Sequence, residues 1–304
     1  MGLTHDGGTR NEQGDGVREG KPVAVIHLDL DGATHIYRAH GWPYDRHDDQ
    51  LFVSGLRHAL DVFDQAGVRA TLFVIAEDVD HRGKREALRD AVRRGHEIAS
   101  HSLTHRSLTA LPLDEKRREV FESRERLAAE LKVHVGGFRA PGFDMDRATL
   151  ELLAEAGYAF DSSLFPTARS AHRVGVSRVA ATPHHPLGAH ALLELPLPAY
   201  RPLPMPFHPS YSLVFGTWYF RLGLKRFRRT GAPFVLLFHL TDFADPLPRR
   251  QLPKWSAALF TLSYLSRQWK VRRCQEMLAL VRRNYRLVST GQLIASRSTT
   301  PGVI

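Results

Sequence analysis

Short buried strands and amphipathic helices alternate along this chain, roughly every 30 residues. Each strand candidate is a run of apolar and β-branched residues, and each helix candidate carries apolar residues at helical spacing. The predicted strands are 22–32, 68–76, 96–101, 135–141, 158–165 and 233–240. The predicted helices are 51–67, 84–95, 113–131 and 146–157. This order predicts parallel βα units wound into one sheet or barrel.

Polar side chains collect where these predicted strands end. Active sites of βα folds lie at that edge of the sheet, because the loops that follow the strands converge there. In chain order the candidates are Asp29 and Asp31, His101 and His105, Arg139, Asp161, and His239. The pattern therefore predicts an active site built from the ends of several strands.

Asp29 and Asp31 stand two residues apart at the end of the first predicted strand, in the motif DLDG. Side chains at that spacing on a strand point to the same side. Two neighbouring carboxylates repel each other unless a cation or a cationic partner offsets their charge. The pair therefore indicates a bound cation or a cationic side chain beside it. The alternative is a turn, since Asp followed by Gly commonly opens one.

His101 and His105 lie four residues apart in the motif HSLTH. On a helical turn this spacing puts both imidazoles on one face, where they can bind a single metal ion. The motif alone is weak evidence, because a chain with 17 His among 304 residues contains about one such pair by chance. Its position after a strand that neighbours the Asp pair is what favours a metal site.

Five motifs, taken in order, resemble the NodB-homology polysaccharide deacetylases, also called carbohydrate esterase family four. They are DLDG, GHEIASHSLTH, FRAP, YAFDSS and LLFHL. The resemblance covers residues 22–295, and the Leu30 that separates the two aspartates is similar to the DxD-type branch of the family. It implies a distorted (β/α) barrel of parallel strands, with a catalytic domain at 22–295. The polar, Gly-rich segment 1–21 is expected to be a disordered lead, and 296–304 a flexible tail.

The resemblance also implies one divalent metal ion, zinc in most of the family, held by Asp31, His101 and His105. Two neutral imidazoles and one carboxylate leave such an ion with a residual positive charge, which suits a Lewis acid that activates water. Asp29 would then be the catalytic base. An exchange of the two roles between Asp29 and Asp31 is the open alternative.

The remaining candidates receive roles from the same resemblance. Arg139 would orient the base Asp29 and hold it ionised. His239 would be the general acid that protonates the leaving amine, and Asp161 would tune His239.

These roles predict a metal-dependent hydrolase that removes an N-acetyl, or similar N-acyl, group from an amino sugar. The order FRAPGF, helix, YAFDSS resembles the branch of the family that acts on bacterial surface sugars. One alternative is a deformylase or another non-sugar amide hydrolase of the same fold. Another is a non-catalytic carbohydrate- or glycolipid-binding module, which has no need for base, metal ligands and acid together.

Basic residues concentrate in the last third of the chain. Residues 199–304 hold 17 Lys and Arg against 3 Asp and Glu, a net charge of +14, whereas residues 1–198 carry −4. This asymmetry suggests an anionic partner, the alternative being a solvated basic surface. The aromatic-basic segments 215–229 and 262–273 predict peripheral contact with an anionic membrane. The alternative is a pair of ordinary barrel helices with basic outer faces.

The segment 1–21 lacks the apolar run of a secretory signal, so we expect a cytoplasmic protein that meets the inner face of the membrane. A cytoplasmic deacetylase would meet its N-acylated amino sugar on a lipid phosphate carrier, because surface polysaccharides are assembled on such carriers. No RNA- or DNA-binding motif accompanies the aromatic-basic segments, and no nucleic acid partner is expected.

Overall fold

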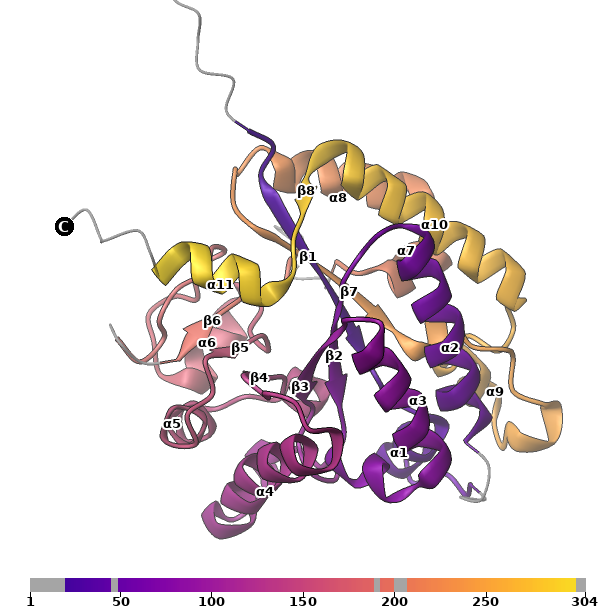
Figure 1. The fold of residues 1–304 in the computed structure, drawn as a ribbon, viewed down its shortest axis with the longest axis horizontal. Coiled ribbons are helices and arrows are strands. Elements are labelled where there is room, and N and C mark those ends of the chain that lie inside the picture. Colours follow the sequence, from indigo (N-terminus) through magenta and orange to yellow (C-terminus); the bar gives the residue numbers. More distant parts are fainter. Residues whose placement is uncertain (1–19, 45–48, 189–191, 200–206, 299–304) are drawn as a thin grey trace, which may run out of the picture.

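Seven parallel strands form a curled half-barrel at the centre of the molecule (Figure 1). This computed structural model describes residues 20–44, 49–188, 192–199 and 207–298. The strand order is β6-β5-β4-β3-β2-β1-β7, and a short strand, β8, pairs with the start of β1. The strands are β1 (Val23–Asp29), β2 (Thr71–Val74), β3 (Glu97–Ser100), β4 (Gly137–Phe138), β5 (Phe160–Asp161), β6 (Leu193–Glu194), β7 (Phe234–His239) and β8 (Arg286–Leu287).

Most helices wrap around the outer side of the curled sheet (Figure 1), whereas the last helix packs against the inner face through Leu293. The α-helices are α1 (Ala33–Ala39), α2 (Gln50–Gln65), α3 (Arg82–Arg93), α4 (Leu113–Leu131), α5 (Arg147–Glu155), α6 (Ala168–Val174), α7 (Pro209–Phe215), α8 (Thr217–Arg228), α9 (Trp255–Phe260), α10 (Arg267–Asn284) and α11 (Thr290–Ser298). Short 3₁₀ turns are η1 (Ala76–Asp80), η2 (Leu108–Ala110), η3 (Pro141–Phe143), η4 (Leu240–Asp242) and η5 (Arg249–Gln251).

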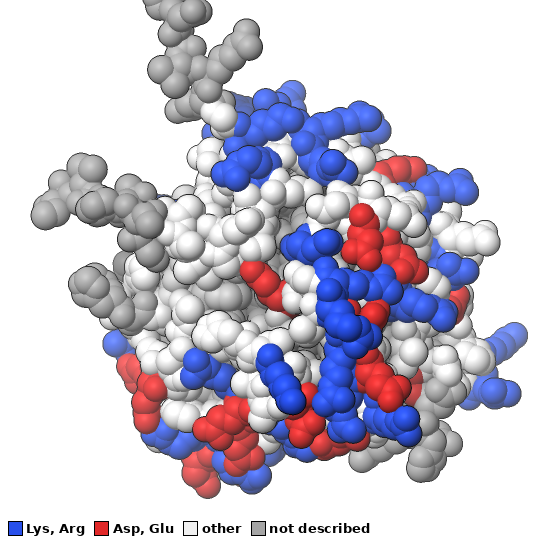
Figure 2. All heavy atoms as spheres, viewed as in Figure 1, with Lys and Arg blue, Asp and Glu red and all other residues white. Residues whose placement is uncertain are grey.

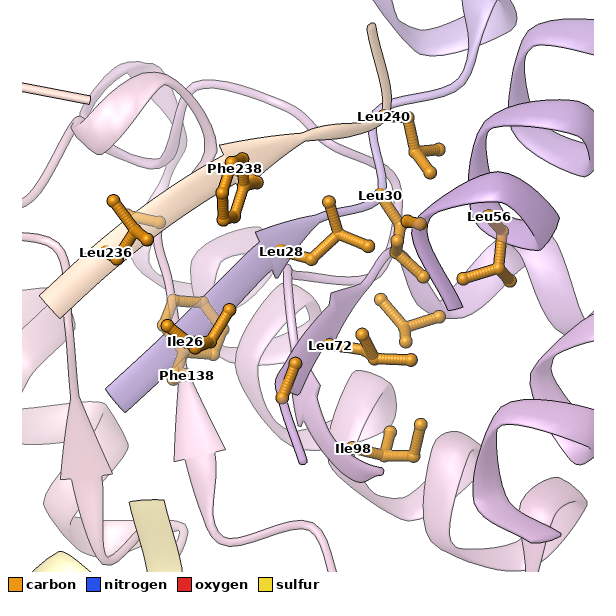
Figure 3. Packing of buried hydrophobic residues seen from close by; sticks show 14 of the residues in the cluster. Ile26, Leu28, Leu30, Leu56, Leu72, Ile98, Phe138, Leu236, Phe238 and Leu240 are labelled. Carbon is orange, nitrogen blue, oxygen red and sulfur yellow. The ribbon is translucent and has the colours of Figure 1, made fainter. Parts of the chain in front are cut away.

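The alternation of side chains along each strand separates two cores. On β1, Ile26 and Leu28 point to the helices, where they pack with residues of β7, β2 and α2 (Figure 3). Val25 points the other way and joins a smaller cluster inside the half-barrel with Phe73 and Leu293. His27 and Asp29 share the side of Val25, so the inner face turns polar toward the C-terminal end of the strand.

The predicted fold class is confirmed by this sheet. Each of the six predicted strands contains one observed strand, and the four predicted helices correspond to α2, α3, α4 and α5. No strand or helix is predicted for residues 167–208, yet the described part of this stretch contains α6 and β6. β6 has only two residues in regular pairing, which is too short to leave a pattern in the sequence.

Elements from both ends of the described ranges join the same sheet. β1 near the beginning pairs with β8 near the end, and α11 runs to Ser298, past the predicted domain limit at 295. Almost all of the predicted lead 1–21, and residues 299–304 of the predicted tail, lie outside the described residues.

Within the described ranges, no helix combines the length and apolar character that a membrane crossing requires.

Candidate active site

The C-terminal ends of four strands meet at one edge of the sheet and carry most of the candidate residues. Asp29, the last residue of β1, is level with His239, the last residue of β7, in their parallel register. β3 ends at Ser100, so His101 follows it directly, and Arg139 follows the neighbouring strand β4. Residues far apart in the sequence are thereby brought to one place.

Asp31, His101 and His105 form a compact set of three possible metal ligands. Asp31 Oδ1 lies 3.2 Å from His101 Nε2 and 3.3 Å from His105 Nε2. One ligand atom from each residue lies within 4.8 Å of the other two, and the two imidazole centroids are 5.0 Å apart. The three side chains therefore point at a common position.

A loop, and not the predicted helical turn, brings the two histidines together. Residues 101–107 contain no helix, and both Ser102 and His105 have positive φ angles, of 67° and 59°. Such angles are unusual for residues other than glycine and are found at functional sites. Glu119 on α4 supports the loop by accepting hydrogen bonds from the backbone N–H groups of Leu103 and Thr104.

The chemistry of these three residues fits a divalent cation. His101 Nδ1 lies 2.8 Å from the carbonyl oxygen of Arg139, so Nδ1 carries the proton and the lone pair of Nε2 is left for a ligand. Asp31 Oδ1 and His105 Nε2 are buried and have no hydrogen-bond partner among the described residues. Buried polar atoms rarely lack partners, and a cation bound between them would satisfy both.

The electrostatics of this set also favour a positive charge at its centre. Burial alone would raise the pKa of the Asp31 carboxyl, but His105 and His101 hold that pKa well below its ordinary value. Burial would likewise lower the pKa of His101, yet the Asp31 carboxylate raises it. The carboxylate thus strongly stabilises positive charge beside it.

Asp29 belongs to a different group, with Arg139 and His239. Its Oδ1 accepts a hydrogen bond of 2.6 Å from Arg139 Nη1, and its Oδ2 lies 3.8 Å from His239 Nε2. Arg139 is fully buried and Asp29 is 2% exposed. The structure therefore separates the two aspartates, Asp31 among the imidazoles and Asp29 on the guanidinium.

The Arg139 guanidinium is fixed on several sides. Its Nε and Nη2 donate to the carbonyl and hydroxyl oxygens of Ser162 at 2.7 and 2.8 Å. Nη2 also lies 2.8 Å from His27 Nδ1, and the guanidinium carbon lies 3.9 Å from the centroid of the Phe73 ring. Sequence reasoning did not single out His27, although its place two residues before Asp29 puts it on the same face of the strand.

His239 contacts two residues that the sequence analysis also missed. The hydroxyl oxygen of Ser210, at the start of α7, lies 3.2 Å from His239 Nδ1. The same hydroxyl donates a 2.7 Å hydrogen bond to Asp242 Oδ1. Asp242 Oδ2 accepts a 2.9 Å hydrogen bond from the backbone N–H of His239. The spacing of Asp242, three residues after His239, was the available signal.

Asp161 lies on the other face of the sheet. Its neighbours Phe160 and Ser162 point to the inner side, so its carboxyl faces outward, level with Glu194 on β6. It accepts a 2.7 Å hydrogen bond from Ser163 Oγ, and burial raises the pKa of Asp161. No contact between Asp161 and His239 occurs among the described residues, so its predicted influence on His239 stays a prediction.

Comparison with known protein families finds one similarity, which covers part of the chain. Residues 44–160 match the family model described as polysaccharide deacetylase. Over this range the chain is similar to the polysaccharide deacetylase family. The matched range includes His101, His105 and Arg139, and ends before Asp161. Asp29, Asp31 and His239 lie outside the matched range, and the fold brings them to the same edge of the sheet.

Solved structures share the fold of this protein over nearly the whole chain. A protein described as a polysaccharide deacetylase from Mycobacterium smegmatis is 22% identical, with a TM-score of 0.65 and coverage of 95% of this chain and 96% of that one. One so described from Pseudomonas aeruginosa PAO1 is 14% identical, with a TM-score of 0.60 and coverage of 90% and 89%. The allantoinase Puue is 13% identical, with a TM-score of 0.62 and coverage of 94% of both chains.

We predict that the protein binds one divalent ion per chain and that Asp31→Asn and His105→Gln each lose most of it. Each change removes a ligand atom from a set of three, and four-coordinate sites seldom survive with two protein ligands. The measurement is metal content by mass spectrometry after incubation with Zn²⁺ and gel filtration. His172→Gln, which alters an exposed histidine on α6, is the matched control. Wild-type metal content in both ligand variants would contradict the site.

Proposed function

We propose that this chain is a metal-dependent hydrolase that removes an N-acetyl, or similar N-acyl, group from an amino sugar. The observation that carries the proposal is the meeting, at one edge of the sheet, of three possible metal ligands with a buried carboxylate–guanidinium pair and a histidine. An amide hydrolase of this kind needs an electrophile, a base and an acid. The geometry offers a candidate for each.

Asp31, His101 and His105 would hold the ion, and two imidazoles with one carboxylate are donors that suit zinc. A divalent ion bound there supplies Lewis-acid chemistry, which polarises the acyl carbonyl and makes the attacking water more acidic. The choice of Asp31 over Asp29 as the ligand follows the resemblance to the DxD-type branch of the family. The grouping of Asp31 with both histidines supports that assignment.

Asp29 is proposed to take the proton from the attacking water. Arg139 occupies only its Oδ1, so Oδ2 is left to accept a proton. The buried guanidinium offsets the cost of keeping a carboxylate away from solvent and fixes its orientation. Positioning of this kind is a large part of the rate enhancement by general bases.

His239 is proposed to donate a proton to the leaving amine. Its Nε2 faces Asp29 Oδ2 at 3.8 Å, which is longer than a hydrogen bond and consistent with the two groups acting in succession on one substrate. Ser210 lies at its Nδ1 and Asp242 at its backbone N–H. The family resemblance assigns the tuning of His239 to Asp161, and we retain that role as part of the proposal.

The substrate we propose is an N-acylated amino sugar carried on a lipid phosphate. The main alternative within the hydrolases is a non-sugar amide, including a formyl group, and the similarity to the fold of an allantoinase favours keeping it as a second candidate. A non-catalytic glycan-binding module is the alternative outside the enzymes. A binding module would not require a buried Asp29–Arg139 pair beside three convergent ligand atoms.

We predict that Asp29→Asn retains the metal but lowers kcat for acetate release by roughly 100-fold or more, the usual scale for removal of a general base. The amide cannot accept the proton, while its shape preserves the fold. Acetate release would be measured on free, polymeric and lipid-linked N-acetylated amino sugars. Asp245→Asn, which removes an exposed carboxylate, is the control. Loss of metal in Asp29→Asn, with retention in Asp31→Asn, would show that the two roles are exchanged.

We also propose peripheral contact with the inner, anionic face of a membrane, through α7 and α8. These helices expose four large apolar side chains: Val214, Phe215, Trp218 and Leu222. No Asp or Glu occurs in residues 209–241, and Figure 2 shows Lys and Arg gathered along the edge where Figure 1 places α8 and α10. Phe220 also belongs to the aromatic-basic segment 215–229, but it is fully buried and contributes to the core.

We predict that the protein co-sediments with anionic vesicles at low salt and is released at high salt. The basic residues concerned are Arg221, Lys225, Arg226, Arg228 and Arg229. Each contributes about 1 kcal/mol near an anionic surface, so changing all five to Gln should abolish the binding.

The matched control changes five exposed, ion-paired arginines elsewhere to Gln and lowers the net charge equally. They are Arg82, Arg93, Arg117, Arg118 and Arg147. Equal losses of vesicle binding in both variants would show that net charge alone causes the binding. No binding by the wild type would contradict the membrane proposal and would leave the deacetylase proposal unaffected.

A further inference from the structure

A line of hydrogen bonds runs through the half-barrel from Arg139 to the first turn of the last helix, α11. Arg139 Nη2 lies 2.8 Å from His27 Nδ1, and His27 Nε2 lies 3.1 Å from Thr290 Oγ1. Thr290 Oγ1 in turn lies 2.7 Å from Thr71 Oγ1, which donates to Glu97 Oε2 at 2.8 Å. Every member except Glu97 is at most 2% exposed, so water is not available to replace these contacts.

The two ends of this line determine the direction of every bond in it. A guanidinium only donates, so His27 Nδ1 accepts and the ring proton is on Nε2. A carboxylate only accepts, so the Thr71 hydroxyl proton is used on Glu97, and Thr290 must donate to Thr71. The Thr290 oxygen is then free to accept from His27 Nε2. Each donor meets one acceptor along the whole line.

We propose that Thr290 fixes the tautomer of His27 and, through it, the position of Arg139 beside Asp29. Both Thr290 and His27 are then positioning residues for the catalytic base, and this inference rests on the proposed function. Without the Thr290 hydroxyl, the Nε2 proton of His27 would be buried without a partner. The other tautomer would place an Nδ1–H against Arg139 Nη2, donor against donor.

Neutral His27 is the form that the surroundings require. Burial and the charge of Arg139 lower the pKa of His27 well below its ordinary value. The tautomer therefore determines whether His27 Nδ1 presents a lone pair or an N–H group to Arg139. The guanidinium also has Ser162 and the Phe73 ring against it, so a repulsive His27 would disturb the guanidinium whose Nη1 holds Asp29.

Glu97 anchors α11 so that Thr290 stays in place. Its two carboxylate oxygens accept the backbone N–H groups of Thr290 at 3.1 Å and Gly291 at 3.0 Å. A carboxylate at the first turn of a helix also stabilises it electrostatically. The last described helix, well beyond the segment that matches the family model, thereby supplies a group that acts on the site.

The first test reads the tautomer directly and needs no substrate. Nitrogen-15 NMR of the metal-loaded wild type, with His27→Gln to assign the His27 signal, distinguishes the two neutral tautomers of the ring. We expect the Nε2–H form in the wild type and in Thr290→Ser, which keeps the hydroxyl. Thr290→Val, which has the same shape without it, should lose that form or mix the two. An Nδ1–H ring in the wild type would overturn the inference.

The second test is the kinetic effect of the same two variants. Loss of one buried hydrogen bond corresponds to roughly a five- to tenfold change, which should appear in the kcat of Thr290→Val with little change in KM. Thr290→Ser should restore kcat, and metal content should be unaffected throughout. An unchanged kcat in a folded Thr290→Val whose tautomer has changed would also overturn the inference. A wild type that releases no acetate contradicts the proposed function alone, because the tautomer is measured separately.

Discussion

The buried ion pair between Arg139 and Asp29 is the interaction on which the rest of the site depends. Removing two charges from water is costly, and such a pair is kept only if its other hydrogen-bonding groups are also satisfied. Those contacts come from Ser162, directly after β5, from His27 on β1 and from the ring of Phe73 on β2. The pair therefore ties the central strands together at the edge where the chemistry is proposed to occur.

The metal ligands and the ion pair are linked through one backbone carbonyl. The carbonyl oxygen of Arg139 accepts the Nδ1 proton of His101, while its side chain holds Asp29. One residue thus sets the tautomer of a proposed ligand and the orientation of the proposed base. A change at Arg139 would consequently affect both the proposed metal ligand His101 and the proposed base Asp29.

The sequence was most informative where function and local pattern coincide. The strand carrying DLDG and the loop carrying HSLTH could be recognised because the chemistry requires polar residues directly after apolar runs. The conformation of that loop could not be foreseen, since positive φ at Ser102 and His105 reflects tertiary support from Glu119 and not a local propensity. Likewise β6 is fixed by pairing with β5 rather than by its own two residues.

Contacts between distant segments could not be predicted from the sequence for a related reason. His27 and Thr290 are 263 positions apart, and neither belongs to a recognisable functional motif. The outward direction of Asp161 follows from the strand pleat, which is fixed only once the register with β6 is known. Ser210 reaches His239 because α7 begins beside the end of β7.

We propose that one divalent ion, held beside the Asp29–Arg139 pair, is required to cleave an N-acyl amide on an amino sugar. The most direct measurement compares acetate and free-amine release by chelator-stripped protein with release after Zn²⁺ is restored, across a set of N-acetylated amino sugars. A required ion predicts no turnover in its absence, and release of equal amounts of acetate and amine in its presence. Turnover by fully stripped protein, or none from any amino sugar by fully loaded protein, would contradict it.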